Sequence, residues 1–389
     1  QISPMFVPYK EYELTKTERK LVYQAIYYHH ERANTIHIDK ELLKDIIEED
    51  IKPNIPKIEN ELQIKVPELK TVYLGMVEGQ ARITEFDDIY KDYCIMKGLL
   101  HRLDHCSSAW IPVEDETSDE ILEFVEKFMK KQNFNPNDLQ QFAKENQGQN
   151  IMVIGSTGMG KTEAALLWSN HDKTFFTLPL RISINAIYDR IKETIGYNHA
   201  GLLHSTAIDY LDEKNEENEF EKIDQARNLY EKVTTCTIDQ IFPFVFKYRG
   251  YEKIYATLSY SKVVIDEIQA YSPEIVAVIL KGLQMINNLN GKFMVMTATL
   301  PRIYKEKLEE MGISFKYNEF IKDTIRHKIQ IVDSKVEQDI DEIKENSNNK
   351  KVLIIVNTIN KAIEIYEKLK DENVTNINLL HSRFIQADR

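Results

Sequence analysis

Cysteine is scarce in this sequence. Its 389 residues include three cysteines, Cys94, Cys106 and Cys236, and none of them forms a CxxC pair. Such a chain has neither a disulfide framework nor the usual cysteine spacing of a structural zinc site. A reducing compartment is therefore expected, and we predict a cytoplasmic protein.

Long apolar runs are also missing. No stretch approaches the ~20 apolar residues that cross a bilayer, and the first ten residues, QISPMFVPYK, lack the apolar core of a signal peptide. We therefore predict no membrane partner.

Basic residues are outnumbered by acidic ones. The chain holds 50 Lys and Arg against 62 Asp and Glu, a formal net charge of −12. A nucleic-acid partner would therefore have to bind in a locally basic groove. Hydrophobic residues nevertheless reach 42%, which is typical of a folded protein, and the length suggests two or three domains.

The order of apolar patterns indicates how the chain is divided. Residues 9–129 have helical periodicity, whereas short apolar runs followed by helical stretches begin after residue 133. That alternation predicts a parallel β-sheet covered by α-helices. A further strand is expected at 327–332 and another just before residue 357. We predict a helical domain over 1–130, an α/β domain over 131–320 and the beginning of a second α/β domain over 321–389.

A phosphate-binding loop is the strongest motif in the sequence. The stretch GSTGMGKT fits G-x-x-x-x-G-K-[ST] and lies between an expected strand, 151–154, and an expected helix, 163–168. Backbone N–H groups of such a loop surround the β-phosphate of a nucleotide, the lysine reaches the β- and γ-phosphates, and the hydroxyl binds Mg²⁺. The predicted ATP-binding residues are Gly155, Ser156, Thr157, Gly158, Met159, Gly160, Lys161 and Thr162.

Two acidic residues follow a second buried strand, 262–265. Parallel sheets bind ligands at the carboxyl ends of their strands, so Asp266 is expected to hold Mg²⁺ through water and Glu267 to polarise the attacking water. A third strand, 293–296, ends at Thr297 and Thr299. Their hydroxyls are expected to relay the state of the γ-phosphate to a neighbouring domain.

A histidine pair lies in the helical N-terminal region. Thr15 and Glu18 fit a capping box, and apolar pairs recur every four residues from Leu21 until His29 and His30 continue the same face. By this pattern alone the two imidazoles are either core histidines or ligands. In the expected helix 92–109, Asp104 lies beside an apolar stripe and is expected to face inward more than His101 or His105. The stripe consists of Ile95, Met96, Leu99, Leu100 and Leu103.

The motifs GSTGMGKT, LPLR, TIDQ, DEIQ and TATLP, in that order, resemble those of superfamily 2 helicases. With VNTINKAIEIYEKL, LLHSRF and the final DR, the sequence is similar to the CRISPR-associated helicase-nucleases of type I systems, which the Cascade surveillance complex recruits. This resemblance implies a fold of three parts. They are a partial α-helical HD-type domain, an α/β RecA-like helicase domain with a parallel sheet, and the start of a second RecA-like domain.

The resemblance implies further site residues. Gln140 would read the adenine edge, with Gln141 as a weaker candidate, and Gln269 would couple ATP hydrolysis to Thr297 and Thr299. Four residues match family positions that contact the backbone of single-stranded DNA. They are Arg181, Thr237, Ser382 and Arg383.

The resemblance also implies a metal site. The HD nucleases of this family have an adjacent His-His pair and a final Asp on a helix, which His29, His30 and Asp104 match. Imidazole and carboxylate ligands suit Mn, Fe, Co or Ni, which would activate water against a phosphodiester. The family's other ligands, a single His, a His-Asp pair and another His, have no match here and are expected upstream of Gln1. The last helicase motif, with its arginine finger, is expected beyond Arg389.

The sequence therefore predicts a fragment of an ATP-dependent single-stranded DNA translocase coupled to a metal-dependent deoxyribonuclease, which degrades foreign DNA in antiviral defence. Its expected cofactors are ATP with Mg²⁺ and a transition metal, and its expected partners are single-stranded DNA and Cascade. The fragment alone is expected to be incomplete for both reactions. Two alternatives stay open. One is an RNA or DNA helicase with a non-catalytic helical domain, and the other is an ATP-dependent interaction switch that does not unwind.

Overall fold

The chain forms two compact units. Unit 1 is Gln1–Lys322 and unit 2 is Asp323–Arg389. The structure, a computed structural model, describes residues 3–9, 11–30, 39–69, 81–215, 218–322, 328–372, 374 and 376–384.

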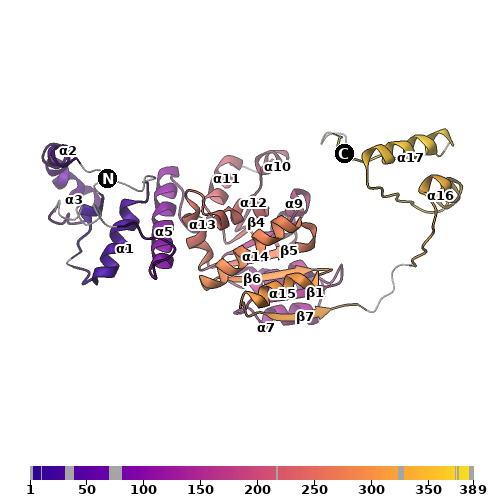
Figure 1. The fold of residues 1–389 in the computed structure, drawn as a ribbon, viewed down its shortest axis with the longest axis horizontal. Coiled ribbons are helices and arrows are strands. Elements are labelled where there is room, and N and C mark those ends of the chain that lie inside the picture. The colour runs from indigo at the N-terminus through magenta and orange to yellow at the C-terminus, as the bar shows by residue number, and fades with distance from the viewer. Residues whose placement is uncertain are drawn as a thin grey trace. The chain divides into compact units, whose positions relative to one another are not determined.

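A seven-stranded sheet is the centre of unit 1. Figure 1 shows this sheet among the helices of unit 1. Its order is β3-β4-β2-β5-β6-β1-β7 and every neighbouring pair is parallel. The predicted parallel sheet is therefore confirmed. Its strands are β1 (Ile151–Gly155), β2 (Thr174–Thr177), β3 (Ala200–Leu203), β4 (Val233–Cys236), β5 (Lys262–Asp266), β6 (Lys292–Thr297) and β7 (Lys316–Phe320).

Alternate residues of each strand enter different cores, because successive side chains point to opposite faces of a sheet. Met152 and Val295 belong to one buried cluster, and Val153 and Met296 belong to the other. Both faces are thus covered, as parallel sheets require. The first face is covered by α5 (Tyr90–Ala109), α13 (Tyr251–Leu258), α14 (Pro273–Asn288) and α15 (Arg302–Glu310), and the second by α6 (Ile121–Lys131), α7 (Asp138–Glu145), α8 (Lys161–Ser169) and α9 (Arg181–Asp189).

Shorter elements complete this part of unit 1. Most of them connect the strands to the helices that cover the sheet. They are η4 (Arg190–Ile195), α10 (Ala207–Glu213), α11 (Glu219–Arg227), α12 (Ile238–Ile241), η5 (Phe242–Phe246) and η6 (Ile268–Ala270).

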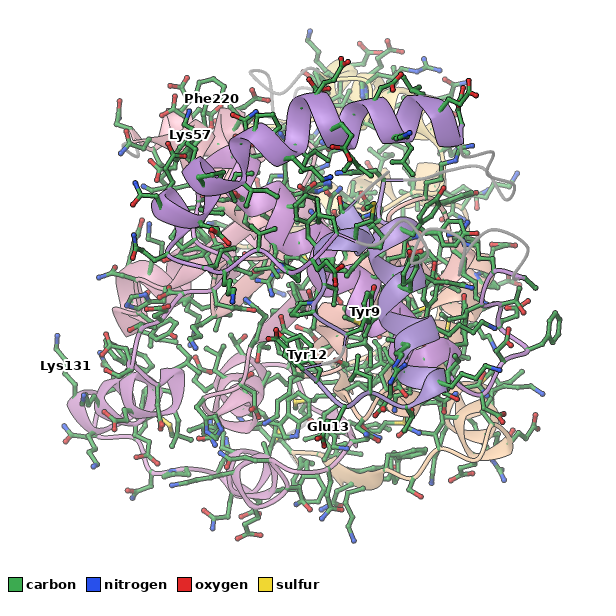
Figure 2. All side chains as sticks on the ribbon, turned by 90° about the vertical axis from the view of Figure 1, so that its left-hand side faces the viewer. Tyr9, Tyr12, Glu13, Lys57, Lys131 and Phe220 are labelled. Atoms are coloured by element: carbon green, nitrogen blue, oxygen red, sulfur yellow. The ribbon has the colours of Figure 1, made fainter. Side chains whose placement is uncertain are left out.

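The N-terminal segment has a smaller core that is rich in tyrosine. Tyr9 is buried and stacks on Tyr23 with ring centroids 5.6 Å apart, whereas Tyr12 is exposed (Figure 2). The predicted capping box is confirmed, since Thr15 caps the first helix and exchanges hydrogen bonds with Glu18. The elements here are η1 (Ser3–Phe6), α1 (Lys16–Tyr27), α2 (Lys40–Asp45), η2 (Ile46–Ile51), η3 (Lys52–Asn54) and α3 (Ile55–Leu62).

The buried face of α5 differs from the predicted stripe. Leu99 and Leu103 are 38% and 51% exposed, whereas Lys97 and Gly98 are buried. The reason is a close, partly polar contact with α13. Lys97 Nζ lies 2.6 Å from Glu252 Oε1, and a Cβ on Gly98 would lie 1.9 Å from a backbone oxygen of α13. Hydrophobic periodicity cannot detect a helix face of this kind.

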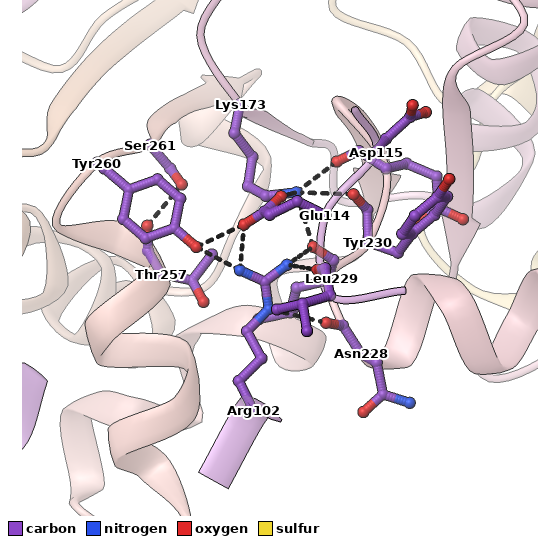
Figure 3. A network of polar contacts seen from close by, with 12 residues as sticks. Arg102, Glu114, Asp115, Lys173, Asn228, Leu229, Tyr230, Thr257, Tyr260 and Ser261 are labelled. Atoms are coloured by element: carbon purple, nitrogen blue, oxygen red, sulfur yellow. Dashed lines mark hydrogen bonds and ion pairs between the residues drawn. The ribbon is translucent and has the colours of Figure 1, made fainter. Parts of the chain in front are cut away.

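Arg102 fixes α5 to the sheet domain. Its side chain is 1% exposed, and all five of its N–H groups have acceptors. Two of these acceptors are side chains, Glu114 and Tyr260, and the others are backbone carbonyls (Figure 3). The carbonyls are those of Asn228 (3.2 Å), Val113 (2.5 Å) and Leu229 (2.5 Å).

Lys173 joins the same network just before β2. Its amine lies 2.8 Å from Glu114 Oε2 and donates to the carbonyls of Leu229 and Tyr230 (Figure 3). Burial lowers the pKa of Lys173 to about 8, although the Glu114 carboxylate opposes the shift. The network therefore links α5, the segment after it and the amino-terminal edge of the sheet.

The predicted boundary at residue 130 does not separate compact units. Helix α6 packs against α8 on the sheet, and α5 packs against α13. The helices on either side of residue 130 are thus parts of unit 1.

Unit 2 contains three helical elements in its described residues. The strands expected near 327–332 and before residue 357 do not form at 328–332 or 351–356. A strand requires a neighbour for its N–H and C=O groups, and the described part of unit 2 provides none. The elements are η7 (Val336–Gln338), α16 (Ile340–Ser347) and α17 (Ile359–Asp371).

Across the described residues of both units, no helix combines the length and apolar character needed to cross a membrane.

The substitution Arg102→Met should destabilise unit 1 by about 3–5 kcal/mol, because it leaves Glu114 and several buried carbonyls without their donor. Urea unfolding of the variant and the parent measures this loss. Arg302→Met is the matched control, since Arg302 is 90% exposed in an ion pair on one helix, and should change stability by less than ~1 kcal/mol. Equal effects of the two substitutions would contradict the anchoring role of Arg102.

Candidate functional site

The phosphate-binding loop lies between β1 and α8, as predicted. Gly158 and Gly160 have φ values of +76° and +72°, a region that residues with a Cβ rarely adopt. A Cβ on Gly160 would also lie 2.4 Å from Gln140 Nε2. Lys161 and Thr162 are the first residues of α8, so their side chains stand at a helix N-terminus suited to an anion.

Three side chains hold consecutive carbonyl groups of this loop. Two of them come from the start of α7, where Asn137 is the N-cap and Gln140 completes a capping box. The third is Lys322, two residues after β7. The contacts are Lys322 Nζ to Gly158 O (3.2 Å), Asn137 Nδ2 to Met159 O (2.8 Å) and Gln140 Nε2 to Gly160 O (3.4 Å).

The acidic pair at the end of β5 faces the loop. Lys161 Nζ lies 3.2 Å from Glu267 Oε1 and 3.3 Å from the carbonyl oxygen of Gly155. Asp266 is 6% exposed, and its Oδ1 atom has no hydrogen-bond partner among the described residues. Burial, and then the charge of Glu267, raises the pKa of Asp266 to about 7. A buried carboxylate oxygen without a partner fits a position that receives a hydrated cation.

Gln269 joins the acidic pair to the end of β6. Its amide nitrogen donates to Glu267, and its amide oxygen accepts from the hydroxyl of Thr297. Thr297 and Thr299 in turn hold each other, because Thr299 N donates to Thr297 Oγ1 at 3.1 Å. A continuous polar chain therefore runs from Lys161 to the TAT segment, and its role in coupling stays a prediction.

The four candidate DNA contacts are divided between the units. In unit 1, Arg181 is exposed at the start of α9, and Thr237 is buried as the N-cap of α12. Ser382 and Arg383 are exposed in a turn of unit 2. The final residues of that motif, 388 and 389, lie outside the described residues. The roles of these four residues in DNA binding stay predictions.

The three candidate metal ligands come together. One ligand atom from each of His29, His30 and Asp104 lies within 4.8 Å of the others. The Nε2 atom of His30 is 3.6 Å from Asp104 Oδ2. His29 Nδ1 lies 2.5 Å from the carbonyl oxygen of Ile26, which can only accept, so in the neutral imidazole the proton is on Nδ1 and the lone pair is on Nε2. Two imidazoles and a carboxylate are a donor set that fits a divalent transition metal.

One expectation about these residues was wrong, and a second was wrong in part. Helix α1 ends at Tyr27, so the histidine pair follows the helix in a bend and does not continue its apolar face. Asp104 is more enclosed than His105, which is exposed, but less enclosed than His101. Burial lowers the pKa of His101, whose ring donates to the carbonyl of His29, while the Asp104 side chain is 38% exposed. His101 thus supports the backbone of the pair, a role that the sequence did not indicate.

Known proteins resemble most of the chain. A DEAD/DEAH box helicase family model matches residues 136–307, and the model for the C-terminal part of the CRISPR-associated nuclease/helicase Cas3 matches residues 348–389. The Cas3 of Methanothermobacter thermautotrophicus is 29% identical over 85% of this chain and 43% of that protein. A putative Cas3 of Methanocaldococcus jannaschii is 26% identical over 88% of this chain and 52% of that protein. This chain is therefore similar to Cas3 nuclease/helicases along most of its length.

Solved structures agree with this family at the level of the fold. T. fusca Cas3-AMPPNP has a TM-score of 0.62 and 16% identity, and the match covers 98% of this chain and 54% of that one. A structure described as a CRISPR-associated protein has a TM-score of 0.55 and 14% identity, over 95% and 51% of the two chains. The Cas3-like chain spans about half the length of the curated relatives that it matches.

Sequence reasoning missed some polar residues at the carboxyl edge of the sheet. Asn137 and Lys322, which hold the phosphate-binding loop, were not among the candidate residues. His204 follows β3 at the same edge of the sheet, where it is 6% exposed and contacts Asn185 Oδ1 at 2.7 Å. Its position directly after an apolar strand, HS after GLL, is the signal that could have found it.

The substitution Asp266→Asn should stabilise the protein at pH 8 and leave it nearly unchanged at pH 4. Between the ordinary pKa of 3.8 and about 7, folded Asp266 keeps a proton that the unfolded chain has lost. The contribution of Asp266 to the free energy of unfolding therefore falls as pH rises through that window. Asparagine does not ionise, so the variant avoids this decrease. Thermal midpoints of variant and parent, measured without Mg²⁺ at pH 4, 6 and 8, test this. A difference in thermal midpoint that does not depend on pH would show that folding does not raise the pKa of Asp266.

Proposed function

We propose that this chain is part of an ATP-driven translocase on single-stranded DNA. The observation that supports this most is the polar chain from Lys161 through Glu267 and Gln269 to Thr297, because it links the nucleotide site to a neighbouring strand end. Names of relatives that include helicase and Cas3 support the same activity.

In this proposal each residue of the nucleotide site has one task. Backbone N–H groups of the loop bind the β-phosphate, and Lys161 moves from Glu267 to the γ-phosphate when ATP enters. Glu267 is then free to accept a proton from the attacking water. Thr162 and Asp266 would hold Mg²⁺, which supplies charge neutralisation at the phosphates. Gln140 stands beside the loop, where the resemblance assigns it to adenine. Gln269 is hydrogen-bonded to both Glu267 and Thr297, so it couples the movement of Glu267 to the end of β6.

The proposed nucleic-acid partner is single-stranded DNA held mainly by its phosphates. Arg181 is exposed at the carboxyl edge of the sheet, and Arg383 is exposed in unit 2. In an acidic chain such isolated cations favour binding that ignores base sequence and weakens with salt. The relatives' names support a place in a CRISPR system, and we propose Cascade as the recruiting complex.

A second proposed activity is metal-dependent cleavage of that DNA. His29, His30 and Asp104 would hold a Mn, Fe, Co or Ni ion, which would supply an activated water for attack on a phosphodiester. The chain's own contribution is to fix the ligands. The Ile26 carbonyl sets the tautomer of His29, and His101 holds its backbone.

The substitution Lys161→Ala in the full-length protein should reduce ATP turnover at least about 100-fold, because the developing charge on the γ-phosphate loses its cation. Phosphate release with and without single-stranded DNA is the measurement. Lys144→Ala is the matched control, since Lys144 pairs with Glu126 away from the loop. Unchanged turnover would refute the translocase. Turnover that DNA does not stimulate in the parent would favour an interaction switch.

Replacing both His29 and His30 by Ala in the full-length protein should abolish cleavage of single-stranded DNA in Mn²⁺ or Co²⁺ and weaken binding of the metal itself. ATP turnover should persist, because Lys161 and Glu267 share no partner with the pair. His105→Ala is the control, an exposed histidine next to Asp104 and outside the ligand cluster. Cleavage at the parental rate would instead favour a helicase with a non-catalytic helical domain.

A further inference from the structure

Lys322 lies at the point where the chain leaves unit 1. It follows β7 by two residues and is exposed. Three hydrogen bonds tie this point to the phosphate-binding loop. Ser156 N donates to Phe320 O at 3.0 Å, Lys322 N donates to Ser156 Oγ at 3.0 Å, and Lys322 Nζ donates to Gly158 O at 3.2 Å.

The last of these bonds determines a peptide orientation. In a planar trans peptide, the C=O of one residue and the N–H of the next point in opposite directions. A donor that holds the Gly158 carbonyl on the outside of the loop therefore turns the Met159 N–H to the inside. Gly158 has a φ of +76° and no side chain, so the loop itself restrains this peptide weakly.

The next two peptides of the loop are held in the same way. Asn137 holds the Met159 carbonyl and thereby directs the Gly160 N–H inward. Gln140 and the first helical bond of α8, from Ala164 N, both reach the Gly160 carbonyl and direct the N–H of Lys161. Three successive inward N–H groups are what an anion-binding loop requires.

We propose that Lys322 is a positioning residue of the nucleotide site. Its amine holds the Gly158 peptide so that the Met159 N–H is ready for the β-phosphate of ADP or ATP before either binds. The inference rests on the proposed nucleotide-binding function, and it assigns to Lys322 a role outside the loop, away from direct phosphate contact. It also joins the loop to the chain segment that leads to unit 2.

The test is the affinity for nucleotides of the full-length protein with Lys322→Met, which keeps the length of the side chain and removes the donor. ADP and ATP should both bind about fivefold more weakly. The lost hydrogen bond orients the Met159 N–H toward the β-phosphate, which both nucleotides have. The KM for ATP should rise by the same factor while kcat stays within about twofold. AMP should bind as to the parent, because it has no β-phosphate.

Three comparisons separate positioning from other roles. Lys322→Arg should restore the affinity, because guanidinium again donates to the carbonyl. Lys316→Met removes the same charge from an exposed position at the other end of β7 and should leave affinity unchanged. The thermal midpoint without nucleotide should also stay unchanged in Lys322→Met, since the side chain is exposed.

Each contrary result has a distinct meaning. Unchanged affinity for ADP in Lys322→Met would overturn the inference, and so would an equal loss in Lys316→Met, which would indicate a general effect of charge. A loss confined to ATP would overturn it as well, because Lys322 would then contact the γ-phosphate itself. If the parent protein binds neither ADP nor ATP, the proposed function fails first.

Discussion

The parallel direction of all seven strands is the constraint on which the nucleotide site depends. Because parallel strands end at one edge, the carboxyl ends of β1, β5 and β6 bring the loop, the acidic pair and the TAT segment together. Lys161 and Glu267, 106 residues apart, then meet at 3.2 Å. Burial on both faces is the cost of this arrangement, and two separate helical layers cover the sheet.

Most of the nucleotide site could be predicted because its residues lie in short local patterns. A strand, a glycine-rich turn and a helix define the loop, and DEIQ and TAT each follow an apolar strand directly. Their meeting follows from sheet topology alone. The residues that hold the loop from outside, Asn137 and Lys322, act through contacts that span 22 and 164 residues, and no local pattern marks such pairs.

The helical region was harder to predict for a different reason. Hydrophobic periodicity predicts apolar buried helix faces, but α5 buries Lys97, Gly98 and Arg102, each of which has a specific partner. A buried ion pair or a missing Cβ leaves no hydrophobic period in the sequence. The histidine pair could be predicted as a ligand candidate because it resembles the adjacent His-His pair of HD nucleases. The helix expected to carry it nevertheless ends at Tyr27.

The anchoring of α5 also bears on how two chemistries could share one unit. Asp104 follows Arg102 by two residues, so the side chain that offers the carboxylate and the one that fixes the helix to the sheet move together. His101, one residue before Arg102, holds the backbone of His29. The three candidate ligands are therefore held in place relative to the sheet through one helix, α5. Substitutions in the histidine cluster and in the nucleotide site should act independently, because the two groups of residues share no polar partner. A substitution at Arg102 should instead disturb both, because Arg102 fixes α5 to the sheet.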